Sequence, residues 1–243
     1  MRYDSQTDLL WGTTAAGGPD DLGTAFYLPT SGGSAVVHLF TWRTGFWPWG
    51  INSWGYGTTY WGGRFYGEGN VFRFSGGNIK PHHTFCYNTK VNAGYYPMGD
   101  LAMQYVNGVR MMYGTTSEGG AGRQGTVYRL KNLGRSSWYI SVLHSFSGSD
   151  GGAPSAGPVL DAAGNLYGTT KVGGTDPGRA GTVFKLTPGP RNKWTHTLLY
   201  SFTGGVDGGY PTSSVTIDAA GNLYGTTQNG GAYGQGVVYE IIP

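Results

Sequence analysis

The chain has 243 residues, of which 46 are Gly and 12 are Pro, whereas only 16 are basic and 13 acidic, for a net charge of +3. So much Gly excludes a helical protein, because each Gly inside a helix costs about 1 kcal/mol relative to Ala. The 10 Phe, 8 Trp and 18 Tyr and the low net charge argue against a disordered chain, and no strict Gly-X-Y period indicates collagen. Length and composition therefore indicate one all-β domain with many turns.

Charge and hydropathy patterns exclude several kinds of partner. Basic residues are dispersed, without the clusters typical of nucleic-acid binders, and no apolar run is long enough to span a membrane. The single cysteine, Cys86, excludes an intramolecular disulfide and a cysteine-based zinc site. The first eight residues lack the apolar core of a signal peptide. We predict no nucleic-acid partner, no membrane span and no cofactor, while the sequence leaves the oligomeric state open.

A four-residue element, aromatic-Gly-Thr-Thr, occurs five times along the chain. Five residues after each of its glycines a Gly-Gly pair begins, and an apolar strand that starts with Gly follows. Self-similarity of this kind is the signature of a repeat architecture. The five copies of the element are Trp11–Thr14, Tyr56–Thr59, Tyr113–Thr116, Tyr167–Thr170 and Tyr224–Thr227. The strands that follow them are Gly23–Leu28, Gly69–Phe74, Gly125–Leu130, Gly181–Leu186 and Gly236–Ile241.

The fourth repeat shows the whole unit. Pro154–Asp161, Leu166–Thr170, Gly181–Leu186 and Trp194–Phe202 have the pattern of strands, and Asp161–Asn165 has that of a hairpin turn. Four short antiparallel strands per unit are typical of a β-propeller blade. We therefore predict an all-β, five-bladed β-propeller with four-stranded antiparallel blades. Residues 1–243 form a single domain, with repeat units of approximately 1–42, 43–87, 88–146, 147–202 and 203–243.

The fifth repeat contains fewer strands than the fourth. It has Pro211–Asp218, Leu223–Thr227 and Gly236–Ile242, and the sequence then stops at Pro243 without a fourth strand. We predict that residues 1–8 supply this strand, so that the N- and C-terminal segments close the ring and remove an exposed edge. The alternative is that residues 1–8 form the inner strand of the first blade.

The repeat resembles a known family. Leu199–Gly205, Asp218–Thr227 and Gly181–Pro188 resemble the GloVer-type tandem repeats of bacteria, most closely over residues 107–243. The Asp-x-x-Gly-Asn turn is also similar to a structural turn of NHL and related propellers. The resemblance implies a β-propeller and, because such repeats occur in exported proteins beside surface anchors, an extracellular or cell-surface location. It implies no reaction.

The histidines do not indicate a metal site. Three of them occupy the same repeated position on the fourth strand of a blade, where the fourth repeat has Tyr. The fourth strand is the outermost strand of each blade, so these side chains are expected to lie far apart. His82 and His83 lie near Cys86, but adjacent residues on a strand point to opposite faces. We predict that no metal is bound. The aligned residues are His38, His83, His144 and Tyr200.

The acids give weak support for catalysis. A glycoside hydrolase needs two carboxylates about 5–10 Å apart. Asp161 and Asp218 recur in the hairpin turn, and Asp150 and Asp207 recur in an Asp-Gly-Gly connection, which indicates structural roles. Of the other acids, Asp100 falls near an expected inner strand. We predict no catalytic residues, and a propeller glycoside hydrolase with a channel acid such as Asp100 is a third possibility.

Residues 40–66 depart from the repeat and hold five of the eight tryptophans. Trp and Tyr combine a flat apolar face with a polar group, which suits the stacking of sugar rings. Alternatively, the rings fill the space of a shortened strand or form a protein interface. The candidate ligand-binding residues are Trp47, Trp49, Trp54, Trp61, Tyr56 and Tyr60.

Together these patterns predict a non-catalytic, lectin-like extracellular module for binding or adhesion, with a carbohydrate ligand. The alternative is a structural or scaffold subunit whose aromatic patch contacts a protein partner. The repeated Thr-Thr-x-x-Gly-Gly segments either line several equivalent sites, as in multivalent lectins, or are simply strand and turn residues.

Overall fold

The computed structural model describes residues 1–63, 67–86, 92–135 and 137–243. They form five separate antiparallel sheets and a single short 3-10 helix, η1 (Pro190–Asn192), which confirms the all-β fold. The first sheet contains β1 (Arg2–Asp4), β2 (Leu9–Thr14), β3 (Thr24–Pro29) and β4 (Val36–Leu39). The second contains β5 (Phe46–Ile51), β6 (Tyr56–Trp61), β7 (Asn70–Ser75) and β8 (Asn78–Thr84). The third contains β9 (Tyr95–Val106), β10 (Val109–Glu118), β11 (Thr126–Gly134) and β12 (Ser137–Ser145). The fourth contains β13 (Val159–Leu160), β14 (Leu166–Thr170), β15 (Thr182–Pro188) and β16 (Trp194–Ser201). The fifth contains β17 (Thr216–Ile217), β18 (Leu223–Thr226) and β19 (Val238–Ile241).

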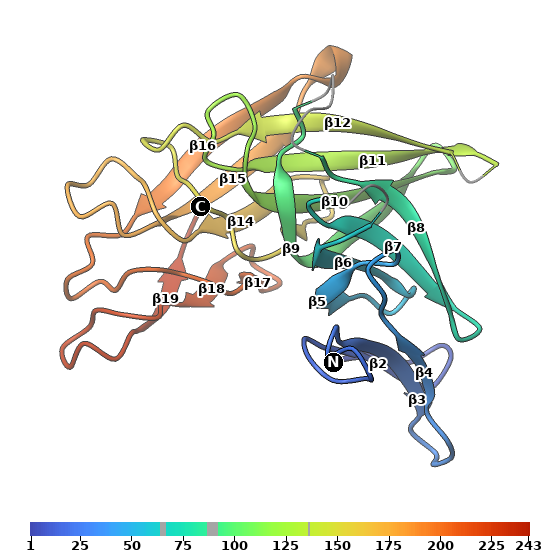
Figure 1. Cartoon of the computed structure of the whole chain (residues 1–243). Coiled ribbons are helices and arrows are strands. Elements are labelled where there is room, and N and C mark those ends of the chain that lie inside the picture. Colours follow the sequence, from blue (N-terminus) through green and yellow to red (C-terminus); the bar gives the residue numbers. More distant parts are fainter. Residues whose placement is uncertain (64–66, 87–91, 136) are drawn as a thin grey trace.

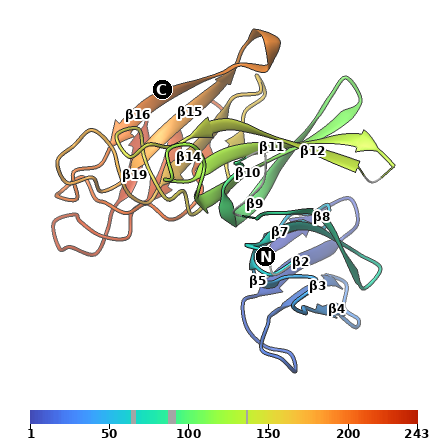
Figure 2. The same cartoon turned by 45° about the horizontal axis from the view of Figure 1, so that its top comes forward.

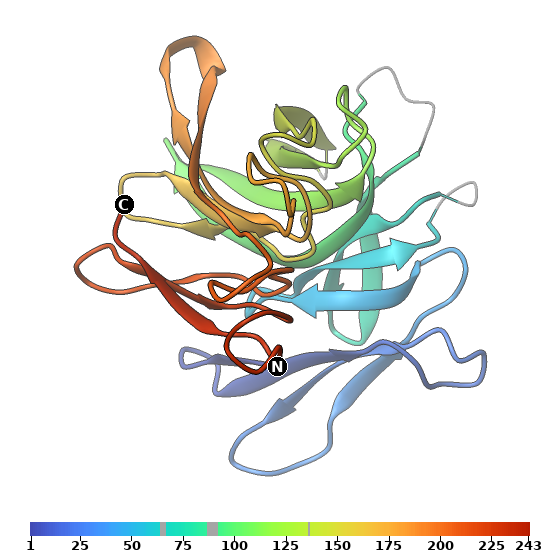
Figure 3. The same cartoon turned by 90° about the vertical axis from the view of Figure 1, so that its left-hand side faces the viewer.

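The sheets follow one another in chain order along a curved path, from the blue first sheet to the red fifth sheet (Figure 1). Figures 2 and 3 show the same succession from two other directions. Within each sheet the strands are also in sequence order, each paired with its neighbour along the chain. The arrangement is propeller-like, with one repeat unit per sheet.

The predicted closure of the ring by the N- and C-terminal segments is wrong. β1 pairs with β2, with Arg2 opposite Trp11, and is therefore the innermost strand of the first sheet. The fifth sheet has three strands, and among the described residues no sheet combines strands from both ends of the chain. Local pairing prevails because the turn between β1 and β2 is short, so that its closure costs little entropy. Asp4 supports this turn by accepting hydrogen bonds from Gln6 and Thr7.

The glycine of each aromatic-Gly-Thr-Thr element makes room for a ring on the next strand. Gly168 pairs with Phe184 across β14 and β15, and a Cβ at Gly168 would lie 2.6 Å from the tip of the Phe184 ring. A ring packed over a glycine in this way stabilises the cross-strand pair. The same pairing occurs in all five sheets. The pairs are Gly12 with Phe26, Gly57 with Phe72, Gly114 with Tyr128, Gly168 with Phe184 and Gly225 with Tyr239.

The two threonines of the element are used inside the structure. In the fourth sheet the Thr169 hydroxyl donates to the carbonyl of Ser213 in the next repeat at 2.9 Å, and Thr170 lies 2.7 Å from the hydroxyl of Thr182. Both threonines are almost fully buried. The same holds for Thr115 and Thr116 of the third sheet. Their hydroxyls therefore join strands and sheets, which favours the structural interpretation of the Thr-Thr-x-x-Gly-Gly segments.

Successive sheets meet through one repeated set of contacts, which we call the joint. At the joint of the fourth and fifth sheets, Tyr210 has a left-handed backbone (φ 58°) and donates its N–H to the carbonyl of Ala180 at 2.6 Å. The next residue, Pro211, packs on Gly181, which has no side chain that would collide with the proline ring. Four joints have this form. Their left-handed residues are Trp47, Tyr96, Ala153 and Tyr210, their prolines are Pro48, Pro97, Pro154 and Pro211, and their glycines are Gly23, Gly69, Gly125 and Gly181.

The hydrophobic core is likewise divided among the joints. Four buried clusters each combine residues of two successive sheets, such as Phe146 of the third sheet with Phe184 and Leu186 of the fourth. None of these clusters joins the fifth sheet to the first, and Gly236, which corresponds to the joint glycines, is surrounded by Thr227 and Gln228 of its own sheet. In the described part of the chain, the five sheets are thus linked in series by four equivalent joints.

Candidate ligand-binding site

A cavity of about 820 Å³ opens at one end of the innermost strands, and residues from all five repeats line it. We call it the aromatic cavity. Two repeated positions provide most of its wall: the residue directly after each Gly-Thr-Thr and the residue directly after each joint proline. At the first position the chain has Ala15, Tyr60, Ser117, Lys171 and Gln228. At the second position it has Trp49, Met98, Ser155 and Thr212.

Two tryptophans on β5 give the cavity its largest exposed rings. Trp47 and Trp49 are 47% and 53% exposed, whereas Pro48 between them is buried. Pro48 pairs with Thr59 and Gly50 with the preceding residue of β6, so Trp49 is the extra residue of a β-bulge. Bulges commonly redirect a side chain at the edge of a sheet. The bulge and the left-handed backbone of Trp47 together direct both rings into the cavity.

Tyr60 continues this aromatic surface at the end of β6. Its ring lies 6.3 Å from Trp47, with 34° between the planes, and stacks on Tyr96 of the third sheet at 4.6 Å and 15°. Trp61 also packs against Tyr96, with ring centroids 4.5 Å apart, but does not line the cavity. Burial, together with the charge of Glu118, raises the pKa of Tyr60. The phenol is therefore neutral at pH 7 and can donate a hydrogen bond.

Polar side chains complete the wall of the cavity. Glu118 and Lys171 are exposed and carry opposite charges, and Gln228 of the fifth repeat offers both a donor and an acceptor. Ser155 and Thr212 add hydroxyl groups. A cavity that combines aromatic rings with a few hydrogen-bonding groups is the usual form of a small-molecule site.

The other candidate residues lie elsewhere. Trp54 lines a second cavity of about 700 Å³, formed by the opposite parts of the innermost strands, and is 52% exposed. Tyr56 is 2% exposed and belongs to the core, where its hydroxyl accepts a hydrogen bond from Arg110. The structure thus brings Trp47, Trp49 and Tyr60 together and places Trp54 and Tyr56 elsewhere. Trp61 contacts Tyr60, with ring centroids 5.8 Å apart, without lining the cavity.

Asp100 lies on β9 in the second cavity. Arg2 of β1 donates to one oxygen of its carboxylate from two nitrogens, at 2.6 and 2.9 Å. Among the described residues that line this cavity, Asp100 is the only acid, and Glu118 is the only acid of the aromatic cavity. Neither cavity therefore presents the two facing carboxylates on which glycoside hydrolysis depends.

The repeated acids hold turns and connections. Burial would raise the pKa of Asp161, but hydrogen bonds from the side chain and backbone of Asn165 outweigh it and lower this pKa. Asp218 accepts the same hydrogen bonds from Asn222 in the fifth repeat. These two acids are structural, as the repetition indicates.

The sequence interpretation overlooked the positions that line the cavity in the other repeats. Lys171 and Gln228 follow the invariant Gly-Thr-Thr directly, and at this position the five copies carry five different residues. Such a change of residue type within an otherwise constant motif is a visible signal. It indicates a position where the fold constrains the backbone but not the side chain.

Repeated antiparallel sheets, linked by equivalent joints around a cavity at one end of their inner strands, define a propeller-like repeat protein. The model of the Gloeobacter/Verrucomicrobia repeat family matches residues 50–243, and the chain belongs to this family. The resemblance to GloVer-type repeats is thereby confirmed. A comparison with curated proteins finds no match. In the described part of the chain, no helix has the length and apolar character needed to cross a membrane.

Proposed function

We propose that the protein is a non-catalytic, extracellular carbohydrate-binding module, and that the aromatic cavity is its site. In this proposal the five sheets act as the blades of a five-bladed propeller, and the joints hold the cavity rigid. Trp47, Trp49 and Tyr60 stack on sugar rings. The single observation that carries the proposal is that the two tryptophans, each about half exposed, line a cavity.

Exposed tryptophans need a partner because their apolar faces remain in water. Contact with a pyranose ring removes apolar surface from water on both sides, while the indole N–H remains available to a hydroxyl. Trp47 and Trp49 come from one strand, so a linear saccharide can contact both rings in succession.

The polar residues of the wall supply the hydrogen bonds that distinguish one sugar from another. Glu118 accepts, Lys171 donates, and Gln228 does both. The volume of about 820 Å³ lies within the range of about 300–1,000 Å³ that is usual for ligand pockets. It is adequate for a short oligosaccharide or for a few residues of a longer chain.

The test is a glycan array followed by calorimetric titration of any glycan that binds. Trp49→Ala is expected to weaken binding roughly tenfold or more, corresponding to the ~1.4 kcal/mol or more that a stacked ring contributes. Trp54→Ala is the matched control, because Trp54 is equally exposed (52% against 53%) but lies in the second cavity. Its affinity is expected to be unchanged.

Two results would overturn the proposal. One is the absence of binding to every glycan of a broad array by the folded protein. The other is binding that Trp54→Ala removes and Trp49→Ala retains, which would place the ligand at the opposite end of the inner strands.

A protein interface is the second candidate, and Trp42 favours it. Its ring is 58% exposed, packs against Phe46 at 4.5 Å and lies outside the aromatic cavity. A partner that covers Trp42, Trp47 and Trp49 together would use a surface larger than a sugar site. Light scattering at increasing protein concentration tests self-association, and Trp42→Ser would reduce it if this surface is used.

A further inference from the structure

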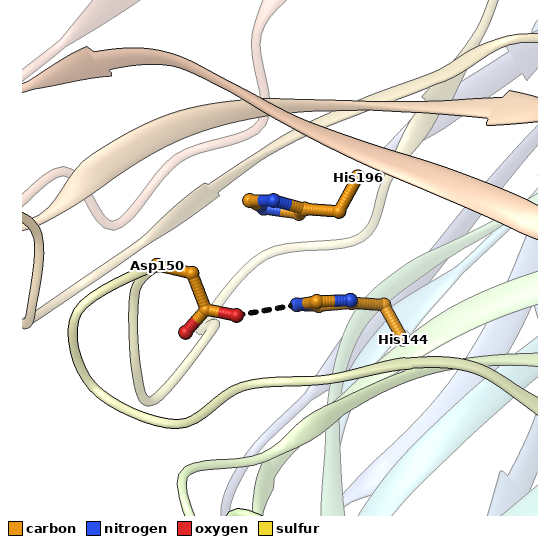
Figure 4. A group of neighbouring side chains, drawn as sticks. All are labelled: His144, Asp150 and His196. Atoms are coloured by element: carbon orange, nitrogen blue, oxygen red, sulfur yellow. Dashed lines mark hydrogen bonds and ion pairs between the residues drawn. The ribbon is translucent and has the colours of Figure 1, made fainter.

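Two histidines and an aspartate meet between the third and fourth sheets. His144 of β12 and His196 of β16 stack, with ring centroids 4.2 Å apart and 15° between the planes (Figure 4). The Nε2 of His144 lies 2.8 Å from an oxygen of Asp150. One ligand atom from each of the three residues lies within 4.8 Å of the others. Sequence analysis predicted no metal site because the aligned histidines were expected to be far apart, and His196 was not among them.

The carboxylate is already oriented toward the histidines. One oxygen of Asp150 accepts hydrogen bonds from the backbone N–H and the hydroxyl of Ser147, at 2.8 and 3.0 Å. The other oxygen faces the rings. Hydrogen bonds of this kind from outside a metal site hold its ligands in place.

His196 has an unused nitrogen. Its Nε2 is buried and has no hydrogen-bond partner among the described residues, which costs free energy for a polar atom out of water. An imidazole nitrogen that no hydrogen bond occupies is available as a ligand for a metal ion.

The neighbouring joint shows which part of the arrangement is structural. There Tyr200 takes the place of His144 and donates to Asp207 at 3.1 Å, so the pairing with aspartate needs no second histidine. In the third sheet, the residue equivalent to His196 is Ile140, because each lies opposite the corresponding leucine of the adjacent strand. Among the described residues, only the joint of the third and fourth sheets combines the aspartate with two histidines.

We propose that His144, Asp150 and His196 form a binding site for one divalent transition-metal ion of the zinc class, which links the third and fourth sheets. Two imidazoles and a carboxylate suit Zn²⁺ and Co²⁺. Three protein ligands leave one tetrahedral position for water. Bond lengths of about 2.0–2.2 Å bring the ligand atoms to about 3.4 Å from one another, so binding requires the stacked rings to turn and their Nε2 atoms to converge. The site is independent of the aromatic cavity.

The test uses the full chain after treatment with a chelator. Calorimetric titration with Zn²⁺ is expected to show one ion per chain. Titration with Co²⁺ is expected to produce the visible absorption of a tetrahedral ion. Zn²⁺ is also expected to raise the melting temperature, because it binds the folded state and not the unfolded one.

The variants are taken from residues that the chain itself has at equivalent positions. His196→Ile introduces the residue found at position 140, and His144→Tyr introduces the residue found at position 200. Each removes one ligand and is expected to weaken Zn²⁺ binding roughly tenfold or more, since even loss of a residue that only orients a ligand costs 10–100-fold. His83→Tyr makes the same exchange outside the site, and Cys86→Ser removes the thiol. Both controls are expected to bind Zn²⁺ as the original chain does.

Any of three results would overturn the proposal. One is failure of the chain to bind Zn²⁺ at equimolar concentration. Binding that persists in folded His196→Ile would exclude the second imidazole. Loss of binding in His83→Tyr or Cys86→Ser would place the ion at β8 instead. Melting curves recorded in chelator show whether each variant is folded.

Discussion

Two sets of repeated positions lie within a few residues of one another along the chain but differ in how much their residues vary. The first, which we call the frame, comprises the Gly-Thr-Thr elements and the residues of the joints. The second, which we call the rim, comprises the residues directly after each Gly-Thr-Thr, which line the aromatic cavity. In the frame, the same residues recur: Gly168 lies under a ring, Thr169 donates to the next sheet, and Gly181 admits a proline. At the rim, the position directly after Gly-Thr-Thr has a different residue in every copy. The frame is mostly buried and sterically restricted, whereas Ala15, Lys171 and Gln228 of the rim are exposed to solvent. The difference teaches that the repeated residues build the fold and that the varied residues are the candidates for recognition.

The largest effect is expected where the frame has no free space. Gly181→Ala places a methyl group against Pro211 and the carbonyl of Thr170 at a left-handed backbone (φ 104°), and we expect a loss of about 3 kcal/mol or more in the free energy of unfolding. Gly221→Ala is the matched control, because its φ is 91° but no atom lies within 4 Å. It should cost only the left-handed strain of about 1–2 kcal/mol. Urea unfolding measures both, and equal losses would contradict a sterically restricted frame.

A partly buried histidine, His83, makes the stability of the protein sensitive to acid. Burial lowers the pKa of His83 to about 4, so between about pH 6.5 and 4 the unfolded chain binds a proton that the folded chain does not. The contribution of His83 to the free energy of unfolding is therefore fully present above pH 6.5. It is lost as the pH decreases toward 4, by at most about 1.4 kcal/mol per pH unit. His82, whose pKa is lowered to about 4 by burial and by the nearby positive charges of Lys80, Arg73 and Arg110, contributes in the same range.

His83→Tyr removes one of these titrations and introduces the residue that the fourth sheet has at this position. The slope of unfolding free energy against pH should decrease between pH 6.5 and 4 and remain unchanged above pH 7. An unchanged slope in acid would show that His83 is protonated in the folded protein.

A smaller effect is expected from one hydroxyl of the frame. Thr169→Val keeps the shape of the side chain but leaves the Ser213 carbonyl without its donor, which should cost about 1–2 kcal/mol. Thr13→Val is the control, because Thr13 occupies the same position in the first copy but is only partly buried. A change within about 0.5 kcal/mol is expected for it. Thermal unfolding followed by circular dichroism compares the two variants.

The smallest effect on stability is expected at the rim. Lys171→Gln introduces the residue that the fifth copy has at this position, and the free energy of unfolding should change by less than about 0.5 kcal/mol. Since Lys171 is the cation of the aromatic cavity, the affinity for acidic glycans should fall more than that for neutral ones. A marked loss of stability would assign Lys171 to the frame.

Much of the fold could be predicted because its signals are local and repeated five times. The predicted strand Leu166–Thr170 is β14, and Trp194–Phe202 differs from β16 by one residue. The inner strand of the fourth sheet is much shorter than predicted: Pro154–Asp161 contains only β13, Val159–Leu160. The preceding residues form the joint and the wall of the aromatic cavity, which requires a left-handed turn before the proline instead of a continuous strand.

The candidate site was predicted only in part. The concentration of tryptophan in residues 40–66 indicated an aromatic surface, and the structure brings Trp47, Trp49 and Tyr60 to one cavity. The sequence could not show that Tyr56 turns into the core, because the face of β6 that becomes buried depends on how the third sheet packs against it.

The sequence by itself determined the all-β class, the five repeats and the places that require glycine, because these follow from steric rules within a few residues. Only the tertiary structure decided which side chains from different repeats meet. Glu118, Lys171 and Gln228 share a cavity with Trp49, and His144 stacks on His196, 52 positions further along the chain. These groupings depend on how each sheet is placed on the next. The joints that set this placement are contacts between segments distant in sequence, so no local pattern specifies them.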